Sequence, residues 1–358
     1  MFADTSFCNV EPAMSSIVRA IDVGHKNVKS VIEAGEAIVC RVFPACAPVA
    51  TGRDLSDTLG RKRQTILVDV DGLTYEVGPD ALLAGTAAPA HNMDDDYCLT
   101  DEYLALVRGA LAYMKVVTVD LLVVGLPVTT FEMHKVALGK RLTGEHRLRD
   151  GKVVAVKEVK VLAQPHGALL DCALSDARMQ SLRRQRNLII DCGARTFDWL
   201  VTQGLKVMEQ RSHATNRGMY DVLQVLAAEI GRHRNIQFHD YERLDLALRT
   251  RTNPLVCGTE YDLTPHLPVA GKIAQEAVTI MRRYVQDGSD IDNIILSGGA
   301  AFFFREALRL AFPQHQIHDR RDGLYANVRG FALYGQQRMA QTDRANAGGA
   351  EGVVARGA

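Results

Sequence analysis

The sequence lacks an excess of charge of either sign. Lys plus Arg and Asp plus Glu both number 42, so the formal net charge at pH 7 is zero. Proteins that bind nucleic acid through bulk charge are strongly basic, and this chain is not. A local basic patch stays open at residues 61–63 (RKR) and 183–186 (RRQR), although solvated loops explain both runs more simply. We therefore predict no direct nucleic-acid partner.

Long apolar runs, a secretory signal and metal-type cysteine spacings are also missing. No run of about 18 apolar residues occurs, so we expect no transmembrane helix. The first fifteen residues contain Asp4 and Glu11 and show no basic start before an apolar block, so we expect no secretory signal. The seven cysteines form no Cys-x-x-Cys motif, and their odd number is most simply explained by reduced thiols. We predict a cytoplasmic protein without a membrane partner.

Helix and strand patterns alternate along the chain. With 358 residues and 47% hydrophobic content, the chain can form two domains with separate cores. Thr100 and Asp240 stand where they could cap helices, and Asp71-Gly72 predicts a hairpin turn. Strands precede long helices in both halves, which predicts an α/β fold with a duplicated domain. Apolar periodicity predicts helices over residues 100–114, 131–142, 218–230, 239–248, 270–285, 303–311 and 326–338.

Two acidic corners carry the strongest functional signal. Residues 188–198 read LIIDCGARTFD, an apolar strand that reaches Asp191 and Gly193 and returns along a second strand. Residues 18–29 read VRAIDVGHKNVK and repeat the pattern around Asp22. Such a corner can point backbone N–H groups at a phosphate while its acid faces a hydrated metal ion. One corner alone would equally fit an ordinary turn aspartate. Two carboxylates on facing loops suit Mg²⁺, which keeps several waters and needs only one or two carboxylates.

A third corner lies late in the chain, where residues 294–300 read IILSGGA before a helix. An ordinary glycine-rich turn is the simpler interpretation. The functional one is that the missing side chains of Gly298 and Gly299 let the backbone lie against adenosine and its α-phosphate. Two Asp-x-Gly hairpins followed by a Ser-Gly-Gly corner suggest a nucleotide held between two halves of the molecule.

In this order the three corners resemble the actin-like ATPase superfamily. Phosphate loop one matches residues 22–29, phosphate loop two matches residues 191–198 and the adenosine loop matches residues 297–300. Within the superfamily the chain looks most like the plasmid-segregation actins of the ParM/StbA family. Residues 159–168 (VKVLAQPHGA) and 325–331 (YANVRGF) support this branch. The resemblance covers about residues 16–340.

The resemblance implies an actin-like (ribonuclease H-like) α/β fold with duplicated domains and a nucleotide cleft between them. The last helix of that fold returns to the first domain. Domain I is therefore expected to comprise residues 16–165 plus 325–340, and domain II residues 166–324. Residues 1–15 are predicted to be a flexible N-terminus. Residues 341–358 are rich in Ala, Gly and Arg without periodicity and are predicted to be a disordered tail.

The resemblance also assigns roles to single residues. Gln164 would orient the attacking water, and Asp22 and Asp191 would complete the catalytic set and hold Mg²⁺. Lys29 would reach the β-phosphate, with Lys26 as a rival closer to the turn. The predicted nucleotide-binding residues are Gly24, Asn27, Lys29, Gly193, Arg195, Thr196, Asn216, Gly298, Gly299 and Ala300.

Alternatives remain at several positions. His166 is a neighbour that could replace Gln164, although a structural role suits it better. Arg195 could stabilise charge that develops during hydrolysis, or it could form a salt bridge to the other domain. Asn216 could line a ribose and purine pocket or only cap the helix that follows. Ala194 stands where relatives carry a glycine, so the hydrolysis rate stays open.

By resemblance, the protein is expected to bind ATP with Mg²⁺, to polymerise head to tail, and to hydrolyse ATP so that the filament becomes less stable. It would serve plasmid DNA segregation through a DNA-binding adaptor at a plasmid centromere. Two other functions stay open. One is a small-molecule kinase of the same superfamily, although no acceptor pocket is evident. The other is a slow-turnover nucleotide-binding scaffold, which Ala194 and Arg195 would favour. The sequence does not decide between ATP and GTP.

Overall fold

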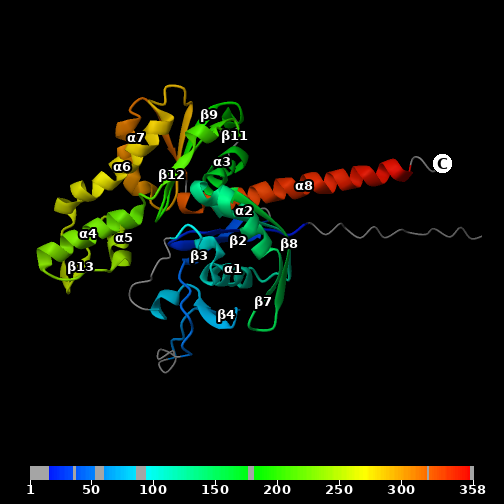
Figure 1. Cartoon of the computed structure of the whole chain (residues 1–358), viewed down its shortest axis with the longest axis horizontal. Helices are drawn as coiled ribbons and strands as arrows, with labels where there is room; N and C mark the ends of the chain where they lie inside the picture. Colours follow the sequence, from blue (N-terminus) through cyan, green and yellow to red (C-terminus); the bar gives the residue numbers. More distant parts are fainter. Residues whose placement is uncertain are drawn as a thin grey trace, which may run out of the picture.

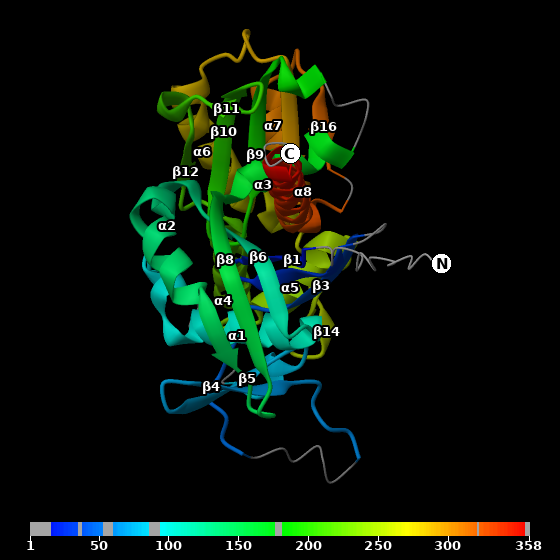
Figure 2. The ribbon, with the colours of Figure 1, turned by 90° about the vertical axis from the view of Figure 1, so that its right-hand side faces the viewer.

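The computed structural model of the protein describes residues 16–34, 38–52, 60–85, 94–175, 181–320 and 322–354. Two sheets, one in each half of the chain, form the body of the molecule (Figures 1 and 2). The first is six-stranded, in the order β3-β2-β1-β6-β8-β7. Its strands are β1 (Val18–Val23), β2 (Asn27–Ala34), β3 (Ile38–Pro44), β6 (Thr118–Leu126), β7 (Gly144–Arg147) and β8 (Val153–Ala163).

The second sheet repeats the plan of the first. Its order is β11-β10-β9-β15-β16, and β12 pairs with β10 outside this path. In each sheet an antiparallel hairpin lies beside parallel strands: β1 pairs with β2 and with β6, and β9 pairs with β10 and with β15. The strands are β9 (Arg186–Cys192), β10 (Phe197–Gln203), β11 (Lys206–Val207), β12 (His213–Thr215), β15 (Asn293–Ser297) and β16 (Ile317–Asp319).

Helices cover both faces of each sheet. They are α1 (Asp101–Met114), α2 (Val128–Leu142), α3 (Gln164–Ser175), α4 (Met219–Arg234), α5 (Tyr241–Thr250), α6 (Leu267–Val285), α7 (Ala301–Ala311) and α8 (Ala326–Val354). Because successive strand residues point to opposite faces, Leu122 and Val124 join a core with α1 and α2, while Leu121 and Val123 join a core with α8. The central strands are thus buried on both faces, which explains their continuous apolar runs.

The local signals for turns and caps are confirmed. Thr100 Oγ1 accepts a hydrogen bond from Tyr103 N at 3.2 Å at the start of α1, and Asp240 caps α5 through Arg243 N at 3.0 Å. Asp71 and Gly72 both have positive φ, 47° and 85°, in the turn between β4 (Ile66–Val70) and β5 (Leu73–Val77). This is the backbone that a two-residue hairpin loop requires. The remaining short hairpin joins β13 (Leu255–Val256) to β14 (Thr259–Glu260).

Helices α3 and α8 pack closely against each other between the two sheets. A Cβ at Gly330 would collide with the carbonyl oxygen of Gly167, so the two backbones meet where neither residue has a side chain. Asp171 on α3, almost fully buried, accepts hydrogen bonds from Arg320 at 2.8 Å and from Arg329 at 2.9 Å. The motifs around residues 164–168 and 325–331 therefore build one packed seam.

The prediction of a disordered tail from residue 341 is wrong for most of that segment. Helix α8 continues to Val354 and projects beyond the body of the protein (Figure 1). Elongating a helix that is already docked needs no new nucleation, and Ala, Gln and Arg are good helix formers. Residues 355–358 and the predicted flexible residues 1–15 lie outside the described residues. The domain boundaries drawn from the resemblance stay a prediction.

Within the described residues, no helix is both long enough and apolar enough to span a lipid bilayer.

Candidate functional site

The first acidic corner is the turn between β1 and β2. Four residues separate the paired Val23 and Val28, and Gly24 N donates to Asn27 O at 3.0 Å. Asp22 and Lys29 face each other across the hairpin, and Lys29 Nζ lies 2.8 Å from Asp22 Oδ2. Asp22 is almost fully buried. A buried carboxylate of this kind requires a charged partner, and Lys29 supplies it.

The second acidic corner, between β9 and β10, has the same backbone plan. Four residues again separate the last pair, and Gly193 N donates to Thr196 O at 2.9 Å. Here Asp191 faces Asp198 across the hairpin, so two acids stand where the first corner has an acid and a lysine. Asp198 accepts a hydrogen bond from Val128 N at 2.8 Å.

Both acids of the second corner have raised pKa values. Burial raises the pKa of Asp191 to about 6, with a further rise from the Asp22 charge and an opposing effect of the Asn327 hydrogen bond. Burial also raises the pKa of Asp198 to about 7, where the Thr196 hydrogen bond opposes it and the Asp191 charge adds to it. Burial disfavours the charged carboxylate and neighbouring carboxylates repel, so both causes act in the same direction.

The glycine-rich third corner lies directly against the second. Gly298 has φ 91°, and a Cβ there would collide with Asp191 Oδ1 and with Cys192 O. Ala300 N donates to Cys192 O at 2.9 Å, and Ser297 Oγ donates to Ile190 O at 3.0 Å. Glycine is required at position 298 both by the backbone angle and by this close approach.

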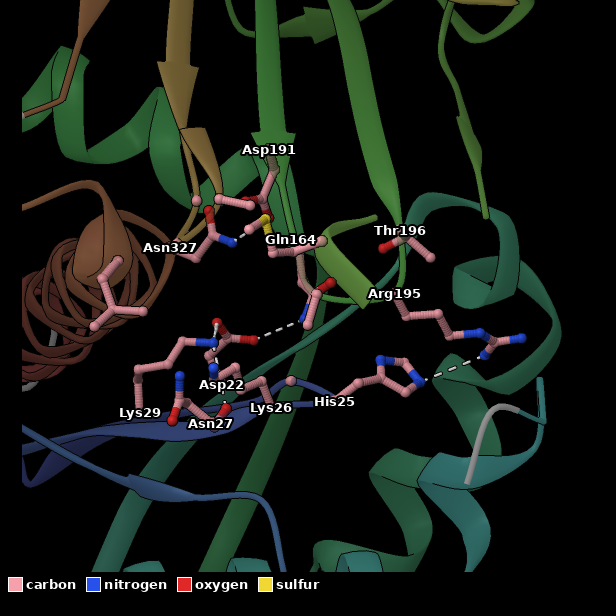
Figure 3. Close-up of a pocket in the computed structure, with 18 of the residues that line it drawn as sticks. Asp22, His25, Lys26, Asn27, Lys29, Gln164, Asp191, Arg195, Thr196 and Asn327 are labelled. Carbon is pink, nitrogen blue, oxygen red and sulfur yellow. Dashed lines mark hydrogen bonds and ion pairs between the residues drawn. The ribbon is translucent and has the colours of Figure 1, made fainter. Parts of the chain in front are cut away.

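Gln164, the first residue of α3, connects the seam to the first corner. Its Nε2 donates to Asp22 Oδ1 at 2.8 Å. On the other side, Asn327 at the start of α8 donates through Nδ2 to Asp191 Oδ2 at 2.6 Å. Each aspartate of the pair Asp22 and Asp191 is thus held by a carboxamide from the interdomain seam (Figure 3). These contacts hold the two carboxylates in place.

One cavity lies where these elements meet (Figure 3). Twelve of the thirteen predicted site residues line it. Asn216 does not: it is exposed, and the N-cap of α4 is Gly218, so neither predicted role of Asn216 is supported. His166 is also absent from the lining, whereas Gln164 is present. The lining comprises Asp22, Gly24, His25, Lys26, Asn27, Lys29, Gln164, Asp191, Gly193, Ala194, Arg195, Thr196, Met219, Arg249, Gly298, Gly299, Ala300, Leu324 and Asn327.

Sequence reasoning missed several lining residues, above all Arg249 and Asn327. Asn327 lies in the motif of residues 325–331, so its position carried a signal that was not converted into a role. Arg249 lies on α5, and no local pattern connects this helix to the cavity. The remaining missed residues are His25, Ala194, Met219 and Leu324, together with Lys26, which was weighed only as a rival of Lys29.

Of the two predicted roles of Arg195, the salt bridge to the other half of the molecule is formed, and stabilisation of charge during hydrolysis stays a prediction. It lines the cavity, and its Nη2 lies 2.9 Å from Asp95 Oδ1 in the opposite half of the molecule. Its Nη1 also donates to Asp94 O at 3.2 Å and lies 3.4 Å from His25 Nε2. The salt bridge to the other half is therefore formed, at the edge of the cavity.

The carboxylates suit a hydrated Mg²⁺ better than a fully protein-coordinated metal. Among the described residues no group of three or more His, Cys, Asp or Glu side chains could hold a metal ion. Asp22 and Asp191 nevertheless line the same cavity, and their mutual repulsion is one cause of the raised pKa of Asp191. A cation between them would relieve this repulsion, and Mg²⁺ needs no more than two carboxylates when phosphates and waters complete its shell.

Solved structures with the same fold cover nearly the whole chain. The crystal structure of apo pSK41 ParM has a TM-score of 0.65 at 18% identity and covers 92% of this chain and 99% of its own. A 15-stranded ParM filament from Clostridium botulinum gives 0.73 at 19% identity, covering 90% of this chain and 100% of its own. Ta0583, an archaeal actin homologue in complex with ADP, gives 0.69 at 18% identity, covering 90% and 99%. These neighbours confirm the predicted actin-like two-domain α/β fold.

Family models match both halves of the chain. Residues 20–167 match the N-terminal domain of actin-like proteins, and residues 189–310 match the C-terminal domain of the MreB-like archaeal actin homologue. No curated protein sequence matches the chain. Because the two matched regions together span most of the chain and contain all three corners of the cavity, the chain belongs to the actin-like proteins, with an actin-like N-terminal and an MreB-like C-terminal domain.

Proposed function

We propose that the cavity binds ATP with Mg²⁺ and that the protein hydrolyses ATP. The observation that carries this proposal is the convergence of two Asp-x-Gly hairpins, the Gly298 corner and Gln164 on one cavity between two sheets. Backbone N–H groups of the two hairpin turns would cradle the phosphates, and the Gly298–Ala300 backbone would lie against adenosine. An actin homologue of the same fold has been solved with ADP, which supports a nucleotide ligand.

Asp22 and Asp191 would hold Mg²⁺ through its water shell. When bound, the ion would neutralise part of the charge on the phosphates. Lys29 lies 2.8 Å from Asp22 and lines the same cavity, so its ammonium would remain beside the phosphates while it balances the carboxylate. Asn327 would orient Asp191 through its 2.6 Å hydrogen bond.

Gln164 would position the attacking water. Its amide nitrogen donates a hydrogen bond to Asp22. Its carboxamide oxygen forms no hydrogen bond within the described residues, so that oxygen remains as an acceptor for a water. Hydrolysis of a γ-phosphate depends on a water held in line with the leaving group more than on a strong base. A glutamine anchored at one end supplies that positioning without a charge.

The proposed biological role is an ATP-dependent filament for plasmid DNA segregation. A structural neighbour of this fold is a ParM filament, which supports self-association. A nucleotide that bridges the two hairpins would set the angle between the two halves, and a subunit held in one shape can add head to tail without closing a ring. We propose a cytoplasmic protein whose filament would reach DNA through a separate adaptor at a plasmid centromere, with no direct contact to nucleic acid or membrane.

Sedimentation with ATP, ADP and a non-hydrolysable ATP analogue tests the proposal. We expect the protein to pellet with ATP and to be released as phosphate accumulates, and to stay in the pellet with the analogue. Phosphate release is measured in the same samples. Turnover without a pellet at any protein concentration would favour a kinase, and nucleotide binding without turnover would favour a scaffold.

A further inference from the structure

Lys26 is a cation of the first corner that the proposed phosphate chemistry does not use. It lies at the third position of the turn and reaches into the other half of the molecule. Its Nζ lies 2.7 Å from Asp245 Oδ2 and 3.1 Å from Glu242 Oε2, both on α5. Glu242 is half exposed, with 52% of its side chain accessible, whereas Asp245 has only 6%. The Lys26–Asp245 contact is therefore the desolvated one, and it joins the two halves.

Asp245 continues this connection to the third corner. Arg249, one turn further along α5, donates through Nε to the same Asp245 oxygen at 2.7 Å. Its Nη1 donates to Gly299 O at 2.7 Å. A path of three side chains therefore runs from the turn of the first hairpin, through Asp245 and Arg249, to the backbone expected to contact adenosine.

Asp245 is held in a costly arrangement. Both cations bind its Oδ2, while its Oδ1 is buried and has no hydrogen-bond partner among the described residues. Burial by itself would raise the pKa of Asp245, but Arg249 and Lys26 outweigh it and leave the pKa below its usual value. A half-satisfied buried carboxylate contributes little to stability, so its contacts need another explanation.

The second hairpin contains the counterpart of Lys26. Arg195 stands at the third position of its own four-residue turn and reaches the opposite way, to Asp95 in the first half. Each hairpin therefore extends one basic side chain to an acid in the opposite half of the molecule. The partner of Arg195 is 66% exposed, so this second ion pair is expected to be the weaker one.

We propose that Asp245 is a positioning residue of the nucleotide site: through Lys26 and Arg249 it holds the first hairpin against the second half and slows dissociation of the bound nucleotide. This inference rests on the proposed function, because it requires a nucleotide in the cavity. Asp245 itself does not line the cavity, so its effect must act through the two cations that do. If Asp245 instead only withheld Lys26 from the phosphates, removing its charge would strengthen nucleotide binding.

The test is the dissociation rate of a fluorescent ADP, labelled with an N-methylanthraniloyl group and displaced by excess ADP in a stopped-flow instrument. Asp245→Asn should release it about tenfold faster than the wild type, since truncating one partner of a desolvated pair acts mainly on the off-rate. Asp95→Asn should change the rate by less than about threefold. Glu158→Gln is the matched control, because it removes an acid from the surface pair with Arg338, away from the cavity.

A double-mutant cycle separates this role from a merely structural one. Lys26→Gln should also speed release. The double variant Lys26→Gln with Asp245→Asn should release the nucleotide no faster than the faster single variant, because both substitutions break one contact. Independent effects that multiply would overturn the proposal, as would Asp245→Asn at the control rate or slower. If Asp245→Asn does not fold, Lys26→Arg should restore the wild-type rate that Lys26→Gln loses, and failure of that rescue would also overturn it. Absence of binding to the wild type would instead refute the proposed function.

Discussion

The two acidic hairpins share a backbone and differ in the side chains that face each other across it. Both have a four-residue turn closed by the same hydrogen bond from glycine. At corresponding positions the first hairpin pairs Asp22 with Lys29, and the second pairs Asp191 with Asp198. The first therefore carries a compensated charge pair. The second carries two acids whose pKa values are raised to about 6 and about 7.

This difference indicates a division of labour. Asp22 already has an ion partner in Lys29, so the first hairpin is suited to a fixed cradle for phosphates. Two carboxylates that face each other repel, and an added cation relieves this repulsion more than it would affect a compensated pair. The second hairpin is therefore the one whose protonation and stability should respond to Mg²⁺.

The largest effect is expected from the second hairpin. Asp191→Asn should lower ATP hydrolysis roughly 10³-fold, because the carboxylate that would hold Mg²⁺ is lost at the point where charge develops. Asp198→Asn makes the same chemical change at the opposite position, outside the cavity, and should lower hydrolysis no more than about tenfold. Phosphate release at saturating ATP and Mg²⁺ gives both rates. Equal hydrolysis rates for the two variants would show that Asp191 has no special role relative to Asp198.

A change at Gln164 affects the first hairpin without altering its own residues, because Gln164 donates a hydrogen bond to Asp22 and not to Asp191. Gln164→Ala should lower the single-turnover hydrolysis rate roughly 10²-fold while ADP affinity stays within about threefold, since positioning of the water acts in the transition state. Single-turnover quench experiments and calorimetric titration with ADP measure the two quantities. An unchanged hydrolysis rate would remove Gln164 from the catalytic set.

Lys29 tests the compensated pair directly. Lys29→Met should weaken Mg²⁺-ADP binding roughly tenfold, because it removes a cation beside the phosphates and leaves Asp22 buried without its ion partner. Lys29→Arg keeps the charge and should recover most of the affinity. Isothermal titration calorimetry gives both values. Wild-type affinity in Lys29→Met would transfer the phosphate role to Lys26.

The smallest effect is the pH dependence that Asp191 confers. Its folded pKa of about 6 lies above its usual value, so the protonated form favours the folded state. That contribution to stability is complete below the unfolded pKa of about 4 and is lost as the pH rises through 6. Mg²⁺ needs the ionised form, so Mg²⁺-ADP affinity should fall about twofold from pH 8 to pH 6. The same titration with Asp191→Asn should lose this component; if it does not, another group titrates.

Local patterns were enough to predict the parts of the site that are consecutive in the chain. The Asp-x-Gly corners, the Ser-Gly-Gly corner, the caps at Thr100 and Asp240 and the Asp71-Gly72 turn depend on neighbours within a few residues. Predictions that depended on contacts with residues distant in the sequence were less complete. Asn216 was predicted to line the pocket because it precedes a helix, but its side chain is exposed to solvent.

Residues 341–354 show the converse case, in which a segment without a local signal is nevertheless helical. Residues 341–354 have no amphipathic pattern, so their sequence predicts no stable element. They are helical because α8 is already anchored on α3 and the first sheet, and the added turns extend an existing helix.

The two acidic hairpins, the glycine corner and their order along the chain follow from local sequence, because backbone turns and buried strands are set by short-range sterics and apolar pattern. The contacts across the cavity depend instead on the packing of the whole chain: Gln164 meets Asp22, Asn327 meets Asp191, and Lys26 meets Asp245. Each of these pairs joins residues more than 100 positions apart. Their contact depends on how two sheets and the α3–α8 seam pack, and no local pattern encodes that packing.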